Sequence, residues 1–340
     1  MQEKNGLLSF CVVGYNHAKY AKSCLASIDQ VKYPNKEVVI LDDGSSDNSV
    51  SVISELIKNL DFSVKTIFQK NTGNVPANFN RAIEQSSGEY IIMMSLDDVV
   101  CYENIPNIIE QLQSNQNVPF VASSSVATIN CNDECSEEIV SPLKLDSLDN
   151  HNIDDLLELE YSEFGAFYIQ GAVWRRKVIE SAGKFDEDIL GDDIVLRTKV
   201  FRYLKSIKNN NYIIQKKTVT KYRRHDNNLS KNYVRQIQIV SEYLDRYWPD
   251  RESPKMFIDW ILYTIGPKSF KESLKVLGTT SRALELLDNS TVFEKIKKKY
   301  KRENSIFNYV FEKKKKEMKE RLLFFLYLKF IIKRTNKRKF

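Results

Sequence analysis

Residues 37–60, EVVILDDGSSDNSVSVISELIKNL, decide the fold class. The first five, EVVIL, end in a continuous apolar run that is typical of a buried strand. The polar residues DDGSSDNS follow, and residues 50–60 then repeat apolar side chains at helical spacing. A buried strand that leads through a polar turn into an amphipathic helix is the building unit of a parallel sheet.

The same order of strand and helix continues on both sides of this stretch. We expect strands over residues 7–13, 64–68 and 90–94, and helices over residues 21–30 and 76–85. Strands that alternate with helices predict an α/β fold with a mostly parallel sheet covered by helices. In such sheets, ligands bind outside the carboxyl ends of the strands.

Three polar clusters follow predicted strands, at the edge where ligands are expected. They are residues 15–17 (YNH), 42–47 (DDGSSD) and 95–98 (SLDD). The adjacent carboxylates of Asp97 and Asp98 repel each other unless a cation or hydrogen-bond donors offset their charge. They indicate a site for a hard divalent cation, or alternatively a helix cap or a solvated turn. Ser45, Ser46 and Asp47 are expected to cap the helix that follows them.

The second half of the chain shows a more mixed pattern. Residues 128–160 are expected to be a polar, loop-rich insertion ending in a helix over residues 153–160. A helix is predicted over residues 193–206 and a short strand over residues 212–214.

Two more carboxylates, Asp192 and Asp193, directly precede the helix predicted over residues 193–206. They have a structural interpretation as an N-cap and a first-turn acid, and a functional one in which one of them is a general base. His225 lies among arginines and amides in YRRHDNNLS. It is either a surface histidine or part of a loop that contacts a diphosphate.

Six motifs in a fixed order carry a family resemblance. They are VVGYNHAKY, EVVILDDGSSDNS, NTGNVPANFNRAIEQSSGEYI, SLDD, GKFDEDILGDD and YRRHDNNLS. Together they resemble the inverting family 2 glycosyltransferases of the GT-A fold, of the bacterial surface-polysaccharide type, over residues 7–230. Two departures are that Val13 and Gly14 replace the usual Pro-Thr or Pro-Ser, and that Ser95 replaces the first aspartate of the D-x-D-D element.

The resemblance implies a nucleotide-sugar donor, with UDP-sugar as the expected class. Val13, through its backbone, and Tyr15 would line the base site, and Asp42 would pair with the uracil imide. The acceptor would be a hydroxyl group of a glycan or of a lipid-linked sugar. Tyr168, Gln170 and Trp174 are candidate acceptor-side residues. Asp193 falls on the family's catalytic base, with Asp192 as the second candidate.

The resemblance also implies a divalent cation, Mn²⁺ or Mg²⁺. Asp97 falls on the metal-ligating position of the family, and Asp98 is its acidic neighbour. His225 matches a histidine in a loop that closes over the donor diphosphate and contacts the metal. All three would therefore bind both donor and metal.

The charge of the chain is divided unevenly. Residues 231–340 hold 27 Lys and Arg against 13 Asp and Glu, a net charge of +14, whereas residues 1–230 have a net charge of −8. We expect a GT-A domain over residues 1–230, in which residues 1–127 bind the donor and residues 128–230 the acceptor. The basic region beyond it is expected to be mostly helical. Its last segment, about residues 318–340, is apolar between lysines, which favours an interfacial helix on an anionic membrane.

These patterns exclude some classes of protein and leave others open. No signal peptide or spanning segment is recognised, so a cytoplasmic protein at the inner face of the plasma membrane is expected. Five cysteines without a CxxC pair argue against a disulfide scaffold, and Cys131 and Cys135 lack partners for a zinc site. Nucleic-acid binding is disfavoured because the aromatics of the tail do not interleave with its lysines. The alternatives are a nucleotide-sugar-binding scaffold, and a tail that packs on protein.

Overall fold

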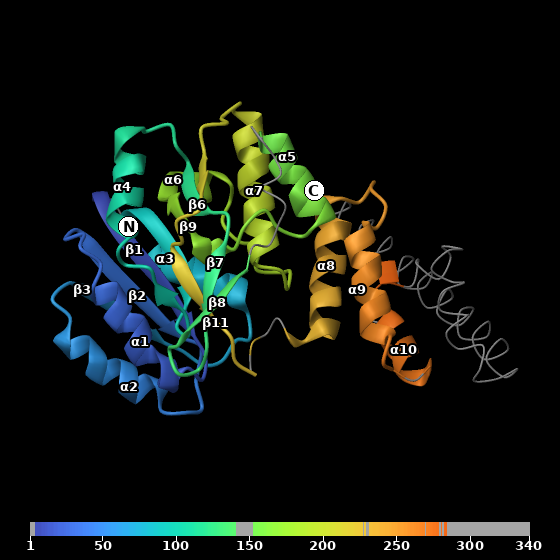
Figure 1. The fold of residues 1–340 in the computed structure, drawn as a ribbon, viewed down its shortest axis with the longest axis horizontal. Helices are drawn as coiled ribbons and strands as arrows, with labels where there is room; N and C mark the ends of the chain where they lie inside the picture. Colours follow the sequence, from blue (N-terminus) through green and yellow to red (C-terminus); the bar gives the residue numbers. More distant parts are fainter. Residues whose placement is uncertain are drawn as a thin grey trace, which may run out of the picture. The chain divides into compact units, whose positions relative to one another are not determined.

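The computed structural model of the chain describes residues 4–140, 152–226, 228, 231–268, 270–278, 280 and 282–283 (Figure 1). The chain divides into two compact units, Met1–Lys231 and Asn232–Phe340. The first unit contains every strand found in the described residues, together with all the predicted site residues. The tail segment over residues 318–340, predicted to lie on a membrane, falls outside the described residues.

The first unit is built on a seven-stranded sheet of order β10-β6-β9-β4-β1-β2-β3. All neighbours are parallel except β9, which is antiparallel to both β4 and β6. The prediction of an α/β fold with a mostly parallel sheet is therefore confirmed. The strands are β1 (Lys4–Gly14), β2 (Lys36–Asp42), β3 (Ser63–Phe68), β4 (Gly88–Ser95), β6 (Phe120–Ser123), β9 (Ala172–Arg175) and β10 (Ile213–Gln215).

Helices cover both faces of this sheet, which explains the continuous apolar runs of its strands. Alternate residues of β1, including Phe10, pack against α1 and α4, while α3 contacts β1 and β2, and α6 contacts β4. Four side chains of α1, at the spacing i, i+3, i+4 and i+7, are buried in this core. The helices are α1 (Ala18–Asp29), α2 (Ser49–Leu56), α3 (Val75–Gln85), α4 (Ile105–Ser114), α5 (Ile153–Ser162), α6 (Arg176–Ser181) and α7 (Asp193–Ser206).

The helix predicted over residues 50–60 is shorter in the structure. The α-helix α2 ends at Leu56, and a 3-10 turn over Ile57–Asn59 completes the segment. The capping role is confirmed for Asp47, whose Oδ1 accepts the N–H of Ser49 at the start of α2 at 2.9 Å, although the residue at the N-cap position is Asn48. Ser45 and Ser46 instead lie in the turn that joins β2 to α2.

A second, four-stranded sheet of order β5-β11-β7-β8 corrects the expectation of a loop-rich segment from residue 128. The loop prediction rested on the polar composition of this segment. Its backbone N–H and C=O groups are nevertheless paired in strands, because β7 pairs with both β8 and β11. The strands are β5 (Val99–Val100), β7 (Val126–Ile129), β8 (Cys135–Val140) and β11 (Thr220–Arg223). This sheet places β11 directly beside the segment that follows Asp97 and Asp98.

The described part of the second unit is helical. Its helices are α8 (Tyr233–Tyr247), α9 (Lys255–Ile265) and α10 (Phe270–Leu277). Their shared core includes Tyr243, Leu244, Phe257 and Ile261. Among the residues described, no helix has the length and apolar character required to cross a membrane.

Candidate active site

The ends of β1, β2 and β4 lie side by side, as the parallel register requires. Gly14 pairs with Asp42, and Val13 pairs with Ser95. A Cβ atom on Gly14 would lie 2.9 Å from the Leu96 side chain, so a larger residue at this position would require the buried Leu96 to shift. The Leu96 N–H donates to the Val13 carbonyl oxygen at 2.9 Å. The three predicted polar clusters therefore meet at one edge of the sheet.

Asp97 is buried at this edge between two histidines. His225 Nε2 lies 2.8 Å from Asp97 Oδ2, and His17 Nε2 lies 3.8 Å from the same oxygen. One ligand atom from each of the three residues lies within 4.8 Å of the others. The structure thus brings together Asp97 and His225, both predicted site residues. It adds His17, which the sequence placed in the first polar cluster but did not mark as a ligand.

The electrostatics around Asp97 favour its negative carboxylate form. Burial alone would raise the pKa of Asp97, but the hydrogen bond with His225 and the charge of His17 hold it below its usual value. Burial lowers the pKa of His17, and the Asp97 charge opposes this. Asp97 Oδ1 and His17 Nδ1 are buried and find no hydrogen-bond partner in the part of the chain that the structure describes. Buried polar atoms without partners are typical of a site that a bound ion or ligand completes.

Asp98 has a different environment. Its Oδ1 accepts the Arg223 backbone N–H at 2.9 Å, and its side chain is fully enclosed. Burial, followed by the charge of Asp97, raises the pKa of Asp98 well above its usual value. Asp98 is not among the atoms grouped around Asp97, so its predicted contacts with metal and donor stay predictions.

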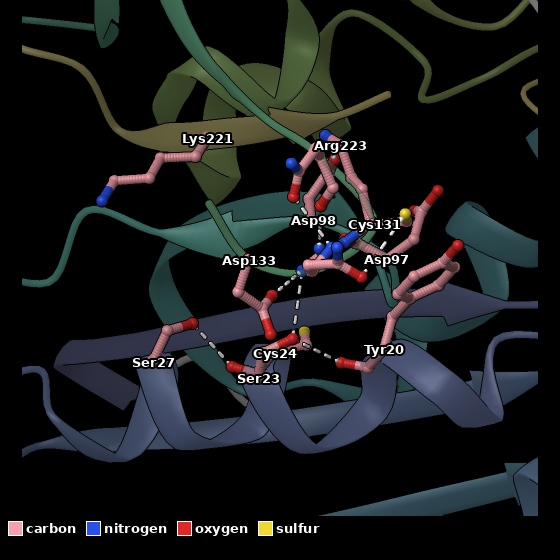
Figure 2. A network of polar contacts seen from close by, with 12 residues as sticks. Tyr20, Ser23, Cys24, Ser27, Asp97, Asp98, Cys131, Asp133, Lys221 and Arg223 are labelled. Carbon is pink, nitrogen blue, oxygen red and sulfur yellow. Dashed lines mark hydrogen bonds and ion pairs between the residues drawn. The ribbon is translucent and has the colours of Figure 1, made fainter. Parts of the chain in front are cut away.

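Arg223, at the end of β11, is fully buried and ties several segments together (Figure 2). Its Nε donates to the Asp97 carbonyl oxygen at 2.6 Å, in addition to the backbone contact with Asp98. The other guanidinium nitrogens donate to the Asn130 carbonyl oxygen, Ser23 Oγ and Asp133 Oδ1. One side chain thus holds the Asp97–Asp98 turn, α1 and the β7–β8 turn in place.

Tyr20 on α1 connects this network with His225. The Arg223 guanidinium carbon lies 4.7 Å from the centre of the Tyr20 ring, and that ring stacks on His225 at a centroid distance of 5.1 Å. Asn228 Oδ1 accepts the His225 backbone N–H at 2.6 Å, and its Nδ2 donates to the Arg223 carbonyl oxygen. The orientation of the His225 ring is therefore set by neighbours on two elements.

We expect Arg223→Lys to lower the free energy of unfolding by about 1–3 kcal/mol, because a lysine cannot donate to all of these groups and leaves buried acceptors unpaired. Urea denaturation measures this change. The matched control is Arg224→Lys, at the exposed next residue, where a change within about 0.5 kcal/mol is expected. Equal losses in the two variants would contradict the role given to Arg223.

Asp193 and Asp192 lie at the start of α7, as the sequence predicted. Asp192 is the N-cap, and its Oδ1 accepts the Asp193 backbone N–H at 2.7 Å. Asp193 Oδ2 has only distant partners, the Ile169 N–H at 3.4 Å and Arg197 Nη1 at 3.7 Å. Arg197 interacts mainly with the buried Glu160, at 2.7 Å. The positive charge nearest to Asp193 is therefore largely compensated by another carboxylate.

Asp193 has the titration expected of a general base. Burial, then the neighbouring charge of Asp192, raises its pKa to about 7. Its side chain nevertheless keeps 30% of its surface exposed, which leaves access for a substrate. The charge of Asp193 also contributes to the raised pKa values of Asp98 and Tyr168. The start of α7 thus lies close enough to the Asp97–Asp98 turn to interact electrostatically with it.

Two of the predicted acceptor-side residues, Trp174 and Tyr168, have different environments in the structure. Trp174 cannot contact an acceptor, because it is fully buried on β9 against Phe120 and Phe167. Tyr168 stacks beside Tyr222 at a centroid distance of 6.2 Å. The interpretation of Trp174 as an acceptor-side residue is therefore wrong.

The predicted donor residues at the ends of β1 and β2 are present at the same edge. Tyr15 is 45% exposed and Val13 is buried. Asp42 is also buried, and its carboxylate accepts the N–H and the hydroxyl of Ser45 at 2.8 and 2.5 Å. Asn16 Oδ1 accepts the Ser46 N–H at 2.7 Å, which links this turn to the end of β1. The roles of Val13, Tyr15 and Asp42 in donor binding stay predictions.

Asp43 is a structural acid that the sequence did not separate from Asp42. Its carboxylate accepts from Gln69, from Thr72 and from the Gly73 N–H. Burial would raise its pKa, but these hydrogen bonds hold the pKa below its usual value. Asp43 therefore fixes the segment between β3 and α3 against the end of β2.

Comparison with known proteins gives a consistent picture. Residues 9–150 match the family model "Glycosyl transferase family 2". The chain is 27% identical over 204 residues to a poly-beta-1,6-N-acetyl-D-glucosamine synthase of Staphylococcus epidermidis, covering 59% of this chain and 47% of that protein. It is 34% identical over 107 residues to glycosyltransferase GlyG of Streptococcus pneumoniae, covering 32% and 35%. The chain thus matches about half the length, or less, of these curated relatives.

Solved structures share the fold at low sequence identity. Residues 1–349 of TarS from S. aureus, in complex with UDP-GlcNAc, match with a TM-score of 0.54 and 15% identity, covering 82% of this chain and 81% of that one. The mannosyltransferase PcManGT from Pyrobaculum calidifontis, in complex with GDP-Man and Mn²⁺, matches with a TM-score of 0.51 and 16% identity, covering 83% and 75%. At this identity the likeness shows the fold.

Proposed function

The chain carries a glycosyltransferase family 2 domain with the GT-A fold, and from this premise we propose that it transfers a sugar from a nucleotide-sugar to a hydroxyl group of a glycan or lipid-linked acceptor, with inversion. The observation that carries the proposal is the pair of acids formed by Asp97 at the sheet edge and Asp193 at the start of α7. Asp97 is ionised beside two histidines, and Asp193 titrates near neutral pH close to the same turn. Asp97 serves the donor, and Asp193 serves the acceptor.

A divalent cation, Mn²⁺ or Mg²⁺, fits the residues around Asp97. The fit rests on Asp97 Oδ1, a buried oxygen for which the described residues offer no hydrogen-bond partner, and on the neighbouring His225 nitrogen. Asp97 and His225 would hold the ion, with Asp98 as an acidic neighbour. Such an ion supplies positive charge that stabilises the diphosphate as it leaves the sugar.

On the acceptor side, Asp193 acts as general base. As the acceptor oxygen bonds to the anomeric carbon, its proton passes to the Asp193 carboxylate, and the bond between that carbon and the diphosphate oxygen breaks. A carboxylate with a pKa near 7 is partly ionised at neutral pH and basic enough to accept a proton. A single displacement from the opposite face inverts the anomeric centre.

On the donor side, Tyr15 and the Val13 backbone would contact the base, and Asp42 the uracil imide. The solvent-exposed Tyr15 ring supports this assignment because it is available for stacking. UDP-sugar is the donor class we favour. The solved neighbours bind UDP-GlcNAc in one case and GDP-Man in the other, so a donor panel has to include both nucleotides.

The basic region also enters the proposal. We assign residues 1–230 to the catalytic domain and residues 231–340 to a basic region that contacts an anionic membrane surface from the cytoplasmic side. The support is the net charge of +14 over residues 231–340. Such docking would suit an acceptor carried on a lipid, as in the synthesis of a bacterial surface polysaccharide.

The function is tested by nucleotide release from UDP-, GDP- and dTDP-sugars, with Mn²⁺ or Mg²⁺ and with a chelator. We expect release from a UDP-sugar that requires the metal and increases when an acceptor is added. Donor binding without release, in the presence of membranes and lipid-linked acceptors, would instead support a nucleotide-sugar-binding scaffold. Release that the chelator leaves unchanged would contradict the metal assignment.

A further inference from the structure

We propose that His17 is a third protein ligand of the cation site, so that two imidazoles and one carboxylate, from His17, Asp97 and His225, select transition-metal ions over Mg²⁺. The inference rests on the proposed function, because it concerns the same cation. His17 takes the place that the sequence gave to Asp98. Asp98 instead accepts a hydrogen bond from Arg223 and lies outside the group.

His17 and His225 reach Asp97 from different elements of the fold. His17 lies at the start of α1, and His225 lies just after β11. Their ring centroids are 6.0 Å apart, with the ring planes at 80°. Both Nε2 atoms approach Asp97 Oδ2, at 3.8 and 2.8 Å. At 3.8 Å, His17 is too far for a hydrogen bond but close enough to share an ion with the carboxylate.

The backbone of His17 is fixed before any ion binds. Its N–H donates to Ser49 Oγ at 3.0 Å, and its carbonyl oxygen accepts the N–H groups of Tyr20 and Ala21 at 2.9 and 3.1 Å. Asn16, just before it, has a φ of 57°, which turns the chain from β1 into α1. A ligand that the fold positions in advance loses little conformational entropy on binding.

An unpartnered oxygen of Asp97 favours a bound ion over a simple contact between the side chains. Asp97 Oδ1 is buried and has no hydrogen-bond partner among the residues that the structure describes. A cation held by Asp97 would supply that partner and offset the cost of burying the oxygen. The His17 side chain is 17% exposed, and its Nε2 lies 3.8 Å from Asp97 Oδ2, so a cation bound to Nε2 would leave Nδ1 to carry the ring proton.

The ligand chemistry predicts the selectivity. Mg²⁺ prefers oxygen ligands and retains its water, whereas imidazole nitrogen suits transition ions such as Co²⁺, Zn²⁺ and Mn²⁺. A site with two imidazoles among three protein ligands should therefore discriminate against Mg²⁺. A site made of Asp97 and Asp98 oxygens would not discriminate against Mg²⁺ in this way.

The experiment uses Co²⁺, whose paramagnetism shifts the exchangeable N–H protons of bound imidazoles in ¹H NMR. We expect two such signals in the full-length protein, of which His17→Gln removes one and His225→Gln the other. Because loss of even an outer-shell partner typically costs about 10- to 100-fold in metal affinity, His17→Gln should weaken Co²⁺ binding at least about tenfold. Lys22→Ala, an exposed position on the same helix, is the control and should change neither readout.

Three results would overturn the inference, and they are distinguishable from a failure of the proposed function. A single shifted signal that only His225→Gln removes would show that His17 is not a ligand, while metal-dependent nucleotide release would persist. Mg²⁺ that displaces Co²⁺ at equal concentration would contradict the selectivity. Absence of Co²⁺ binding together with chelator-insensitive release would remove the cation from the function altogether.

Discussion

Replacement of Asp193 by asparagine is expected to lower kcat by about 10²- to 10⁴-fold, the usual contribution of a general base. The amide has nearly the same size and can still interact with Arg197, but it cannot accept the acceptor's proton. The KM for the donor should change little, because Asp193 is assigned to the acceptor. Steady-state kinetics at saturating acceptor measure both quantities.

The pH profile separates loss of the base from loss of structure. In the wild type, kcat/KM should rise with pH until Asp193 is ionised, near its pKa of about 7, and then level off. Since its pKa is raised in the folded state, ionisation of Asp193 opposes folding, and stability should fall as the pH rises toward 7. Asp193→Asn removes this cost, so the variant should be at least as stable as the wild type at neutral pH.

Asp192→Asn is the matched variant for this test. Asparagine caps helices as well as aspartate does, so α7 should keep its start. The charge of Asp192 is the second cause of the raised pKa of Asp193, after burial. Its removal should therefore move the rising limb of the profile to lower pH with a smaller loss of kcat. A larger loss in Asp192→Asn than in Asp193→Asn would identify Asp192 as the base.

The large sheet could be predicted from the sequence because local patterns mark its strands. Apolar runs mark its central strands, and polar turns mark their carboxyl ends, so the clusters around Asp42 and Asp97 could be placed at one edge. The small sheet could not be predicted in this way. Its strand β11 pairs with β7 from about a hundred residues earlier, and both are short and partly polar. Their identity as strands depends on contacts that no local window contains.

The same limit applies to individual site residues. Arg223 and Arg224 are adjacent and look alike in the sequence, yet one is fully buried and the other exposed. Burial of Arg223 depends on acceptors from distant segments, including Asp98, which is 125 positions away. His17 could be noticed in the first cluster, but its distance to Asp97 follows only from the register of β1 and β4.

Replacement of Asp97 by asparagine is expected to lower the rate of nucleotide release by about 10²- to 10³-fold, similar to the loss of one preorganised electrostatic partner of the developing charge. Asparagine is close in size to aspartate but neutral, so it should bind a cation more weakly and interact less strongly with both histidines. Release should be measured over a range of Mn²⁺ concentrations. A metal-binding defect predicts that high Mn²⁺ recovers part of the rate.

Asp98→Asn distinguishes a charge effect at Asp97 from disruption of the turn. Burial and the charge of Asp97 raise the pKa of Asp98, so a negative charge at this position is unfavourable, and asparagine is a neutral isostere that can still accept the Arg223 N–H. We therefore expect a smaller loss of activity than in Asp97→Asn and no shift in the Mn²⁺ dependence. If the two variants instead lost activity and Mn²⁺ affinity equally, both carboxylates would hold the ion. The cation site would then include Asp98, as predicted from the sequence, in place of His17.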